Sequence, residues 1–114
     1  MKFSYEGIGQ WAATFACSNL QEGAVVKIGG NSTVAACGDG DAFCGQVIAC
    51  AADGKACSVA MGGLVTASYS GTAPAAGWGK LSADGSNGVK ADSNGTDYLI
   101  VAVDTTAKTV TFAL

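Results

Sequence analysis

Short segments rich in valine, threonine and aromatic residues alternate with clusters of glycine, asparagine and aspartate along this chain. No window carries a sustained apolar stripe at the 3.6-residue period of an amphipathic helix. β-branched and aromatic residues favour strands, and the intervening clusters favour tight turns. The pattern therefore predicts an all-β fold, with strands at 12–17, 24–28, 32–36, 43–50, 56–61, 63–69, 97–103 and 108–113.

The chain has 114 residues, of which 49% are hydrophobic and 13% charged. A chain of this length and composition forms one domain with a sizeable core and needs no disulfides to fold. We expect a small antiparallel β-barrel or sandwich at 12–114, preceded by an N-terminal arm at 1–11.

The clearest local structure is a hairpin near the C-terminus, where DYLIVAV and KTVTFA flank a loop from Asp104 to Ala107. If Val103 faces Lys108, then Leu99 faces Phe112, and large apolar groups share one face of the sheet. The sequence thus predicts a half-buried antiparallel pair in this register.

Two halves of the sequence resemble one another. Residues 25–48 and 78–103 each contain a lysine segment, a glycine turn, a short valine segment, a second glycine turn and a segment led by an aromatic residue. In this alignment Phe43 matches Tyr98. The likeness indicates either two similar β-units in one small fold or turn chemistry that both halves share.

The composition excludes several chemistries. Histidine and arginine are both absent, which removes the commonest general base and the side chain best suited to forked contacts with phosphate. The net charge of −3 disfavours nucleic acid and anionic membranes as partners. We therefore expect a protein that is not an enzyme and binds neither nucleic acid nor a membrane.

Five cysteines occur without a C-x-x-C pair, and the N-terminus has no apolar run of signal-peptide length. These features predict synthesis in a reducing cytoplasm and free thiols that pack as small apolar groups.

The stretch ACGDGDAFCG at 36–45 carries two acids, three glycines and two cysteines. Asp39 and Asp41 lack the later glutamate of a calcium loop, and the cysteine spacing differs from that of structural zinc sites. The GIGQWA run at 7–12 lacks the preceding strand of a dinucleotide loop. No metal or cofactor is expected, and 36–45 is interpreted as a turn.

Aromatic residues offer the better candidates for a functional surface. The predicted N-terminal arm contains four large apolar residues, Phe3, Tyr5, Ile8 and Trp11. Trp78 lies between two glycines. Tryptophan and tyrosine anchor protein interfaces, although large aromatics also fill small cores. We predict that these five residues contact a partner, with core packing as the alternative for Trp78.

The runs EGAVVKIGGNSTVAACGDGDAFCGQVI, GGLVTASYSGTAPAAGWGKLSADGSNGVK and YLIVAVDTTAKTVTFAL resemble a family of small head-decoration proteins of tailed phages and prophages. The shared layout covers about Glu22 to Leu114 and consists mostly of turns and strands. The resemblance implies a compact β-barrel, often trimeric, that sits on the outer surface of a capsid and holds neighbouring subunits together. Five cysteines depart from the family pattern.

The leading hypothesis is thus a virion structural protein that binds the major capsid protein as a homotrimer. A carbohydrate-binding β-sandwich is the alternative, with Trp11, Trp78 and Tyr69 as stacking platforms for sugar rings.

Overall fold

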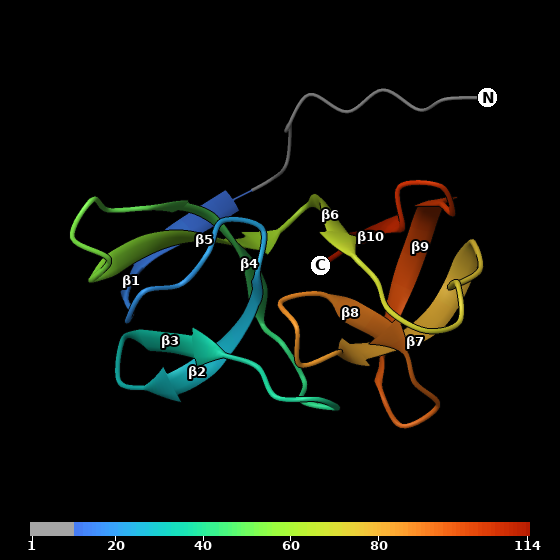
Figure 1. Ribbon diagram of the computed structural model, residues 1–114, viewed down its shortest axis with the longest axis horizontal. Helices are drawn as coiled ribbons and strands as arrows, with labels where there is room; N and C mark the ends of the chain where they lie inside the picture. Colours follow the sequence, from blue (N-terminus) through green and yellow to red (C-terminus); the bar gives the residue numbers. More distant parts are fainter. Residues whose placement is uncertain (1–10) are drawn as a thin grey trace.

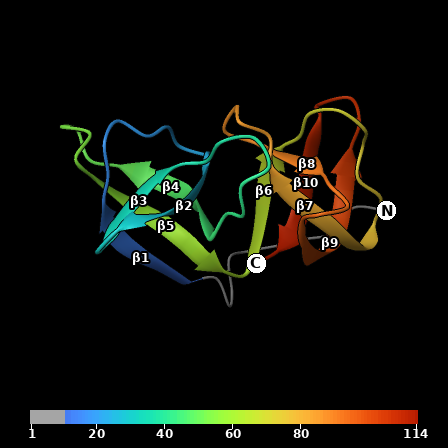
Figure 2. The ribbon, with the colours of Figure 1, turned by 90° about the horizontal axis from the view of Figure 1, so that it is seen from below.

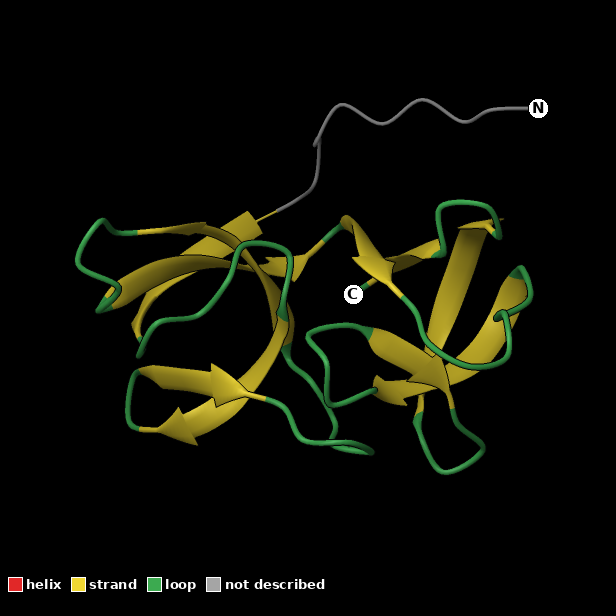
Figure 3. Ribbon diagram, viewed as in Figure 1, coloured by secondary structure: helices red, strands yellow, loops and turns green. Residues whose placement is uncertain are grey.

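The computed structural model describes residues 11–114, which form ten β-strands and no helix (Figures 1 and 3). The all-β prediction is therefore confirmed. The strands are β1 (Trp11–Ala16), β2 (Val25–Gly30), β3 (Thr33–Ala36), β4 (Gly45–Cys50), β5 (Ala56–Gly62), β6 (Leu64–Ser68), β7 (Gly77–Ala83), β8 (Val89–Ala91), β9 (Thr96–Asp104) and β10 (Thr109–Ala113).

The strands make two five-stranded units that lie side by side (Figure 1). In the first unit the order β1-β3-β2-β4-β5 closes into a barrel, because β5 pairs back onto β1. In the second unit the order is β6-β10-β9-β7-β8. A single residue, Gly63, joins β5 to β6, and its positive φ of 91° lets the chain turn from one unit into the other.

The two units share one connectivity. When β1 to β5 are matched in order with β6 to β10, every antiparallel pairing of the first unit has its counterpart in the second. Even the parallel contact between Ala16 and Thr33 has an equivalent, the bridge between Tyr69 and Val89. The expectation of two similar β-units is thus confirmed at the level of strand pairing.

The second core is completed by the first unit. The barrel core consists of Val26, Val34, Val47, Cys57 and Val59. The second core contains residues of β6 to β10 together with three from the first unit, Val25, Phe43 and Ala60. Successive strand residues point to opposite faces, so Val25 faces the second core while Val26 faces the barrel. The first unit therefore helps to bury the apolar surface of the second. Figure 2 shows the two units side by side from below.

Eight strands were predicted within two residues of their observed ends. The eight predicted strands do not include β7 and β8, although the alignment of the two halves places a lysine segment and a valine segment there. The sequence GWGKLSA of β7 alternates glycine with larger residues, so its local β propensity is weak. These two strands form because β9 offers a paired edge to β7.

The predicted register of the C-terminal hairpin is wrong by two residues, because Val103 pairs with Val110 and not with Lys108. Asp104 pairs with Thr109 and Val103 with Val110, so the loop is 105–108. The Asp104 carboxylate accepts backbone hydrogen bonds from Thr106 and Ala107 at 3.0 Å each, and this side-chain turn sets the loop.

A bulge follows between Thr111 and Phe112, so Phe112 faces Ile100 instead of Leu99. Phe112 is buried as expected, whereas Leu99 is 39% exposed.

Candidate functional site

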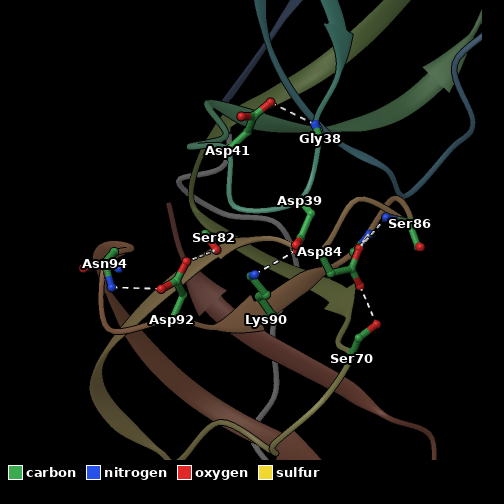
Figure 4. Close-up of polar contacts among 11 residues, drawn as sticks. Gly38, Asp39, Asp41, Ser70, Ser82, Asp84, Ser86, Lys90, Asp92 and Asn94 are labelled. Carbon is green, nitrogen blue, oxygen red and sulfur yellow. Dashed lines mark hydrogen bonds and ion pairs between the residues drawn. The ribbon is translucent and has the colours of Figure 1, made fainter.

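The acid-rich stretch at 36–45 connects β3 to β4 and spans the junction of the two units (Figure 4). Asp39 forms an ion pair of 2.8 Å with Lys90 of β8, and Asp41 forms one of 2.6 Å with Lys27 of β2. The Gly38 backbone also donates to the Asp41 carboxylate at 2.9 Å. Both aspartates therefore serve as contacts that hold this loop in place.

Backbone bonds fix the same loop to the second unit. The Gly40 N–H donates to the Ala83 carbonyl at 2.8 Å, and the Ala83 N–H donates to the Asp41 carbonyl at 2.9 Å. Gly40 has a φ of 86°, a conformation that favours glycine. The stretch at 36–45, which most resembles a ligand loop in the sequence, thus forms backbone hydrogen bonds with the last residue of β7.

The neighbouring carboxylates of Asp84 and Asp92 also accept hydrogen bonds from other groups of the protein (Figure 4). Asp84 accepts hydrogen bonds from the Ser70 hydroxyl and from the backbone of Ser86 and Gly88. Asp92 accepts from the Asn94 backbone and the Ser82 hydroxyl, and these two bonds lower its pKa. Among residues 11–114 no group of three acidic, histidine or cysteine side chains could hold a metal ion.

Charge pairing shifts the pKa values at the junction in the expected directions. The hydrogen bond from Lys27 and then that from the Gly38 backbone hold the pKa of Asp41 below its ordinary value. The hydrogen bond to Asp39 raises the pKa of Lys90. Both shifts favour the charged forms of Asp41 and Lys90, as expected for members of ion pairs.

The five cysteines are free thiols, and each is buried or half-buried. Burial, followed by the hydrogen bond with Cys17, raises the pKa of Cys57 to about 11. Burial is also the main cause that raises the pKa of Cys37 to about 11 and that of Cys44 above its ordinary value. A thiol with a raised pKa is a poor nucleophile at neutral pH. Four of the five cysteines pack in or against the two cores, as expected of small apolar groups.

Trp78 is the most exposed large apolar side chain of the described residues, at 77%. It lies in β7 between Gly77 and Gly79. Because side chains alternate along a strand, the two glycines take the inward positions and the tryptophan points outward. A Cβ atom at Gly79 would lie 3.0 Å from the Ile100 side chain, so the core leaves no spare room there.

An apolar row extends from Trp78 across the outer face of the second sheet. Trp78 faces Leu99 of β9, Leu99 faces Ala113 of β10, and Ala113 faces Leu64 of β6. Residues directly opposite in antiparallel strands share one face of the sheet. We call these four residues the Trp78 row. The ion pair between Lys80 and Asp97, at 3.2 Å, borders the row two residues farther along β7 and β9.

Trp11 lies in the first unit, as the first residue of β1, and is 59% exposed. It pairs with Gly62, and its indole occupies the space where a Cβ atom of Gly62 would lie. Gly62 is two residues from Leu64 along the chain. Trp11 is therefore near the β6 end of the Trp78 row.

The predicted site residues have different outcomes. Phe3, Tyr5 and Ile8 lie outside the residues that the structure describes. Trp11 and Trp78 are exposed strand residues. Tyr69 is 6% exposed and belongs to the second core, so it cannot serve as a stacking platform for a sugar. Leu99 was expected in the core and lies next to Trp78, because the bulge in the last hairpin reverses its face.

Two hollows on the first unit, of about 260 and 300 Å³, have no charged side chain in their lining. Among residues 11–114 no helix has the length and apolar character to cross a membrane. No protein-family model matches the chain, and no curated protein matches it in sequence. The resemblance to head-decoration proteins stays a prediction.

Proposed function

We propose that this chain is a virion structural protein that decorates the outer surface of a phage capsid by binding the major capsid protein. The observation that carries the proposal is the Trp78 row, in which an exposed tryptophan on a paired strand continues into apolar neighbours across the sheet. The resemblance to the head-decoration family adds the partner, the trimeric assembly and the location on the virion.

The Trp78 row has the character of an interface anchor. Tryptophan is enriched among the residues that dominate binding energy, and a buried aromatic covers about 150–250 Å². At about 25 cal/mol per Å², burial of the exposed part of such a ring supplies about 3 kcal/mol before the costs of association. Many copies on one capsid would multiply this contact.

Electrostatics fit the outer face of a capsid better than its DNA-filled interior. The chain carries nine acidic residues against six lysines. Three lysines, Lys27, Lys80 and Lys90, are paired with aspartates. A protein that neutralises phosphates needs unpaired cations grouped on one face, since each phosphate contact uses a cation.

Co-sedimentation with expanded empty capsids tests the proposal. The wild-type chain should pellet with capsids at micromolar concentration, and Trp78→Ala should bind about 30-fold more weakly, as expected for loss of an interface anchor of about 2 kcal/mol. Ile28→Ala is the matched control, because Ile28 is 54% exposed on β2 in the other unit. Circular dichroism verifies that both variants keep the fold.

Failure of the wild-type chain to pellet would contradict the proposal. Equal binding by Trp78→Ala and the wild-type chain would move the contact away from the Trp78 row. Deletion of residues 1–10 tests the predicted contribution of Phe3, Tyr5 and Ile8 in the same assay.

A carbohydrate-binding module is the second candidate, because Trp78 offers one exposed flat ring. The burial of Tyr69 removes one of its three predicted platforms. A glycan array distinguishes the two functions: binding of one sugar class by a monomer, lost in Trp78→Ala, would favour the carbohydrate module.

A further inference from the structure

Three of the five cysteines gather at one end of the first barrel. Cys50 is the last residue of β4, Cys57 is the second residue of β5, and Cys17 directly follows β1. Cys57 belongs to the barrel core, and the other two pack against it. The Cys50 thiol donates to the Leu20 carbonyl at 3.1 Å, and the Cys17 thiol donates to the Gly54 carbonyl at 3.5 Å.

Cys50 and Cys57 are direct partners across the β4–β5 hairpin. The next pair, Ala51 and Ala56, is joined by a backbone hydrogen bond of 2.9 Å. Because bonded and non-bonded pairs alternate in an antiparallel ladder, the cysteines occupy a non-hydrogen-bonded position. At such positions the Cα atoms lie about 4.5 Å apart and the side chains approach closely. This separation falls within the disulfide range of about 4.4–6.8 Å.

Cys17 is the rival partner, because its thiol hydrogen-bonds with the Cys57 thiol, but its backbone is less well placed for a disulfide. Phe15 is the residue of β1 that faces Cys57, so Cys17 is two residues farther on, at the diagonal position. Diagonal Cα atoms in antiparallel strands lie about 7–8 Å apart. Beyond about 7 Å a disulfide requires backbone movement. The backbone therefore selects Cys50 as the partner of Cys57.

We propose that Cys50 and Cys57 form a site of reversible disulfide formation, with small-molecule disulfides as the oxidant. The half-buried Cys50 reacts first: its thiolate attacks the small disulfide, forms a mixed disulfide and releases one thiol. Cys57, which is 2% exposed, then attacks the Cys50 sulfur and releases the second thiol. In sum, two protein thiols and one small disulfide give one protein disulfide and two small thiols. This inference does not depend on the proposed capsid role.

Mass spectrometry after incubation with glutathione disulfide tests the site in the folded full-length chain at about pH 8.5, because burial raises the pKa of both thiols and less thiolate is present at neutral pH. The product should lose two hydrogen atoms without a glutathione adduct. Lys55 lies between the two cysteines, so trypsin separates them into peptides 28–55 and 56–80, while Cys17 falls in peptide 3–27. Cys57 is the single cysteine of peptide 56–80. The expected result is a disulfide between peptides 28–55 and 56–80.

Matched variants assign the partner, because peptide 28–55 also contains Cys37 and Cys44. The link should disappear in Cys50→Ser and persist in Cys44→Ser and in Cys17→Ser. A link that persists in Cys50→Ser, a link between peptides 3–27 and 56–80, or a product that carries glutathione alone would overturn the proposal. No reaction in the wild-type chain, with circular dichroism showing the folded state, would also overturn it.

Discussion

Phe43 provides the sharpest test of how the two β-units depend on one another. Its ring comes from the loop before β4 of the first unit and lies in the core of the second. It stacks on Tyr98 with centroids 5.1 Å apart and planes 7° apart, and it meets Phe112 edge to face at 5.8 Å. The side chain is 6% exposed. Phe43→Ala would thus leave a cavity that strands β9 and β10 cannot readily fill.

We expect Phe43→Ala to lower the free energy of unfolding by about 4 kcal/mol, since truncation of a buried phenylalanine costs about 3–5 kcal/mol. The aromatic contacts with Tyr98 and Phe112 place the value in the middle of this range and not at its lower limit. Domains of this size have a total stability of about 5–15 kcal/mol, so the variant should be close to its folding limit at ambient temperature.

Urea unfolding followed by circular dichroism and tryptophan fluorescence measures the effect. Trp11 reports on the first unit and Trp78 on the second, so single-tryptophan variants give each unit its own probe. Because the second core includes residues of the first unit, both probes should give one shared midpoint. Ile48→Ala is the control, at 44% exposure on β4, with an expected change of about 0.5 kcal/mol. A loss below about 1 kcal/mol in Phe43→Ala would refute the reasoning.

Two further predictions concern a charge and a turn. The pKa of Asp41 is lower in the folded state than in the unfolded state, so its contribution is complete above about pH 5 and is lost as the pH falls through the folded value. Asp41→Asn should therefore flatten the acid limb of stability against pH, and an unchanged slope in urea melts would contradict the role of the Lys27 pair. Lys108 has a φ of 56°, where a residue with a Cβ atom is strained by about 1–2 kcal/mol. Lys108→Gly should stabilise the chain by about 0.5 kcal/mol in thermal melts, after the entropy that glycine adds to the unfolded state, and destabilisation would contradict this account.

The repeat of the two halves illustrates how far local pattern reaches. The alignment that matched Phe43 with Tyr98 identified the two β-units, because both halves use the same order of segments and turns. It did not show that these two rings stack on each other across the junction. Contacts between the units depend on which residues of one unit enter the core of the other. A periodic pattern within either unit does not predict those contacts.

The Trp78 row also combines features that the sequence predicts with features that only the tertiary structure shows. The glycines beside Trp78 are visible in the sequence, yet they left core packing and partner binding both open for its side chain. The partner of Trp78 in the row, Leu99, was assigned to the core, because an unbroken alternation along the hairpin gives that result. A bulge between Thr111 and Phe112 reversed the face of Leu99. A bulge is one residue inserted into a ladder, and it changes the outcome for every residue beyond it.

By itself, the sequence determined the class of the fold, the position of most strands and the lack of histidine and arginine chemistry, because these follow from residue types and short-range periodicity. The sequence predicted a turn for ACGDGDAFCG, and only the tertiary structure decided which groups hold that turn in place. Its aspartates pair with Lys27 and Lys90, and its phenylalanine fills the second core. The aspartate carboxylates pair with lysines, and the Phe43 ring packs against Tyr98, which is distant in the chain. These contacts use the same groups that a ligand would otherwise have contacted. The physical reason is that a carboxylate or an aromatic ring has the same chemistry in a site as in a scaffold, and only its neighbours in space distinguish the two.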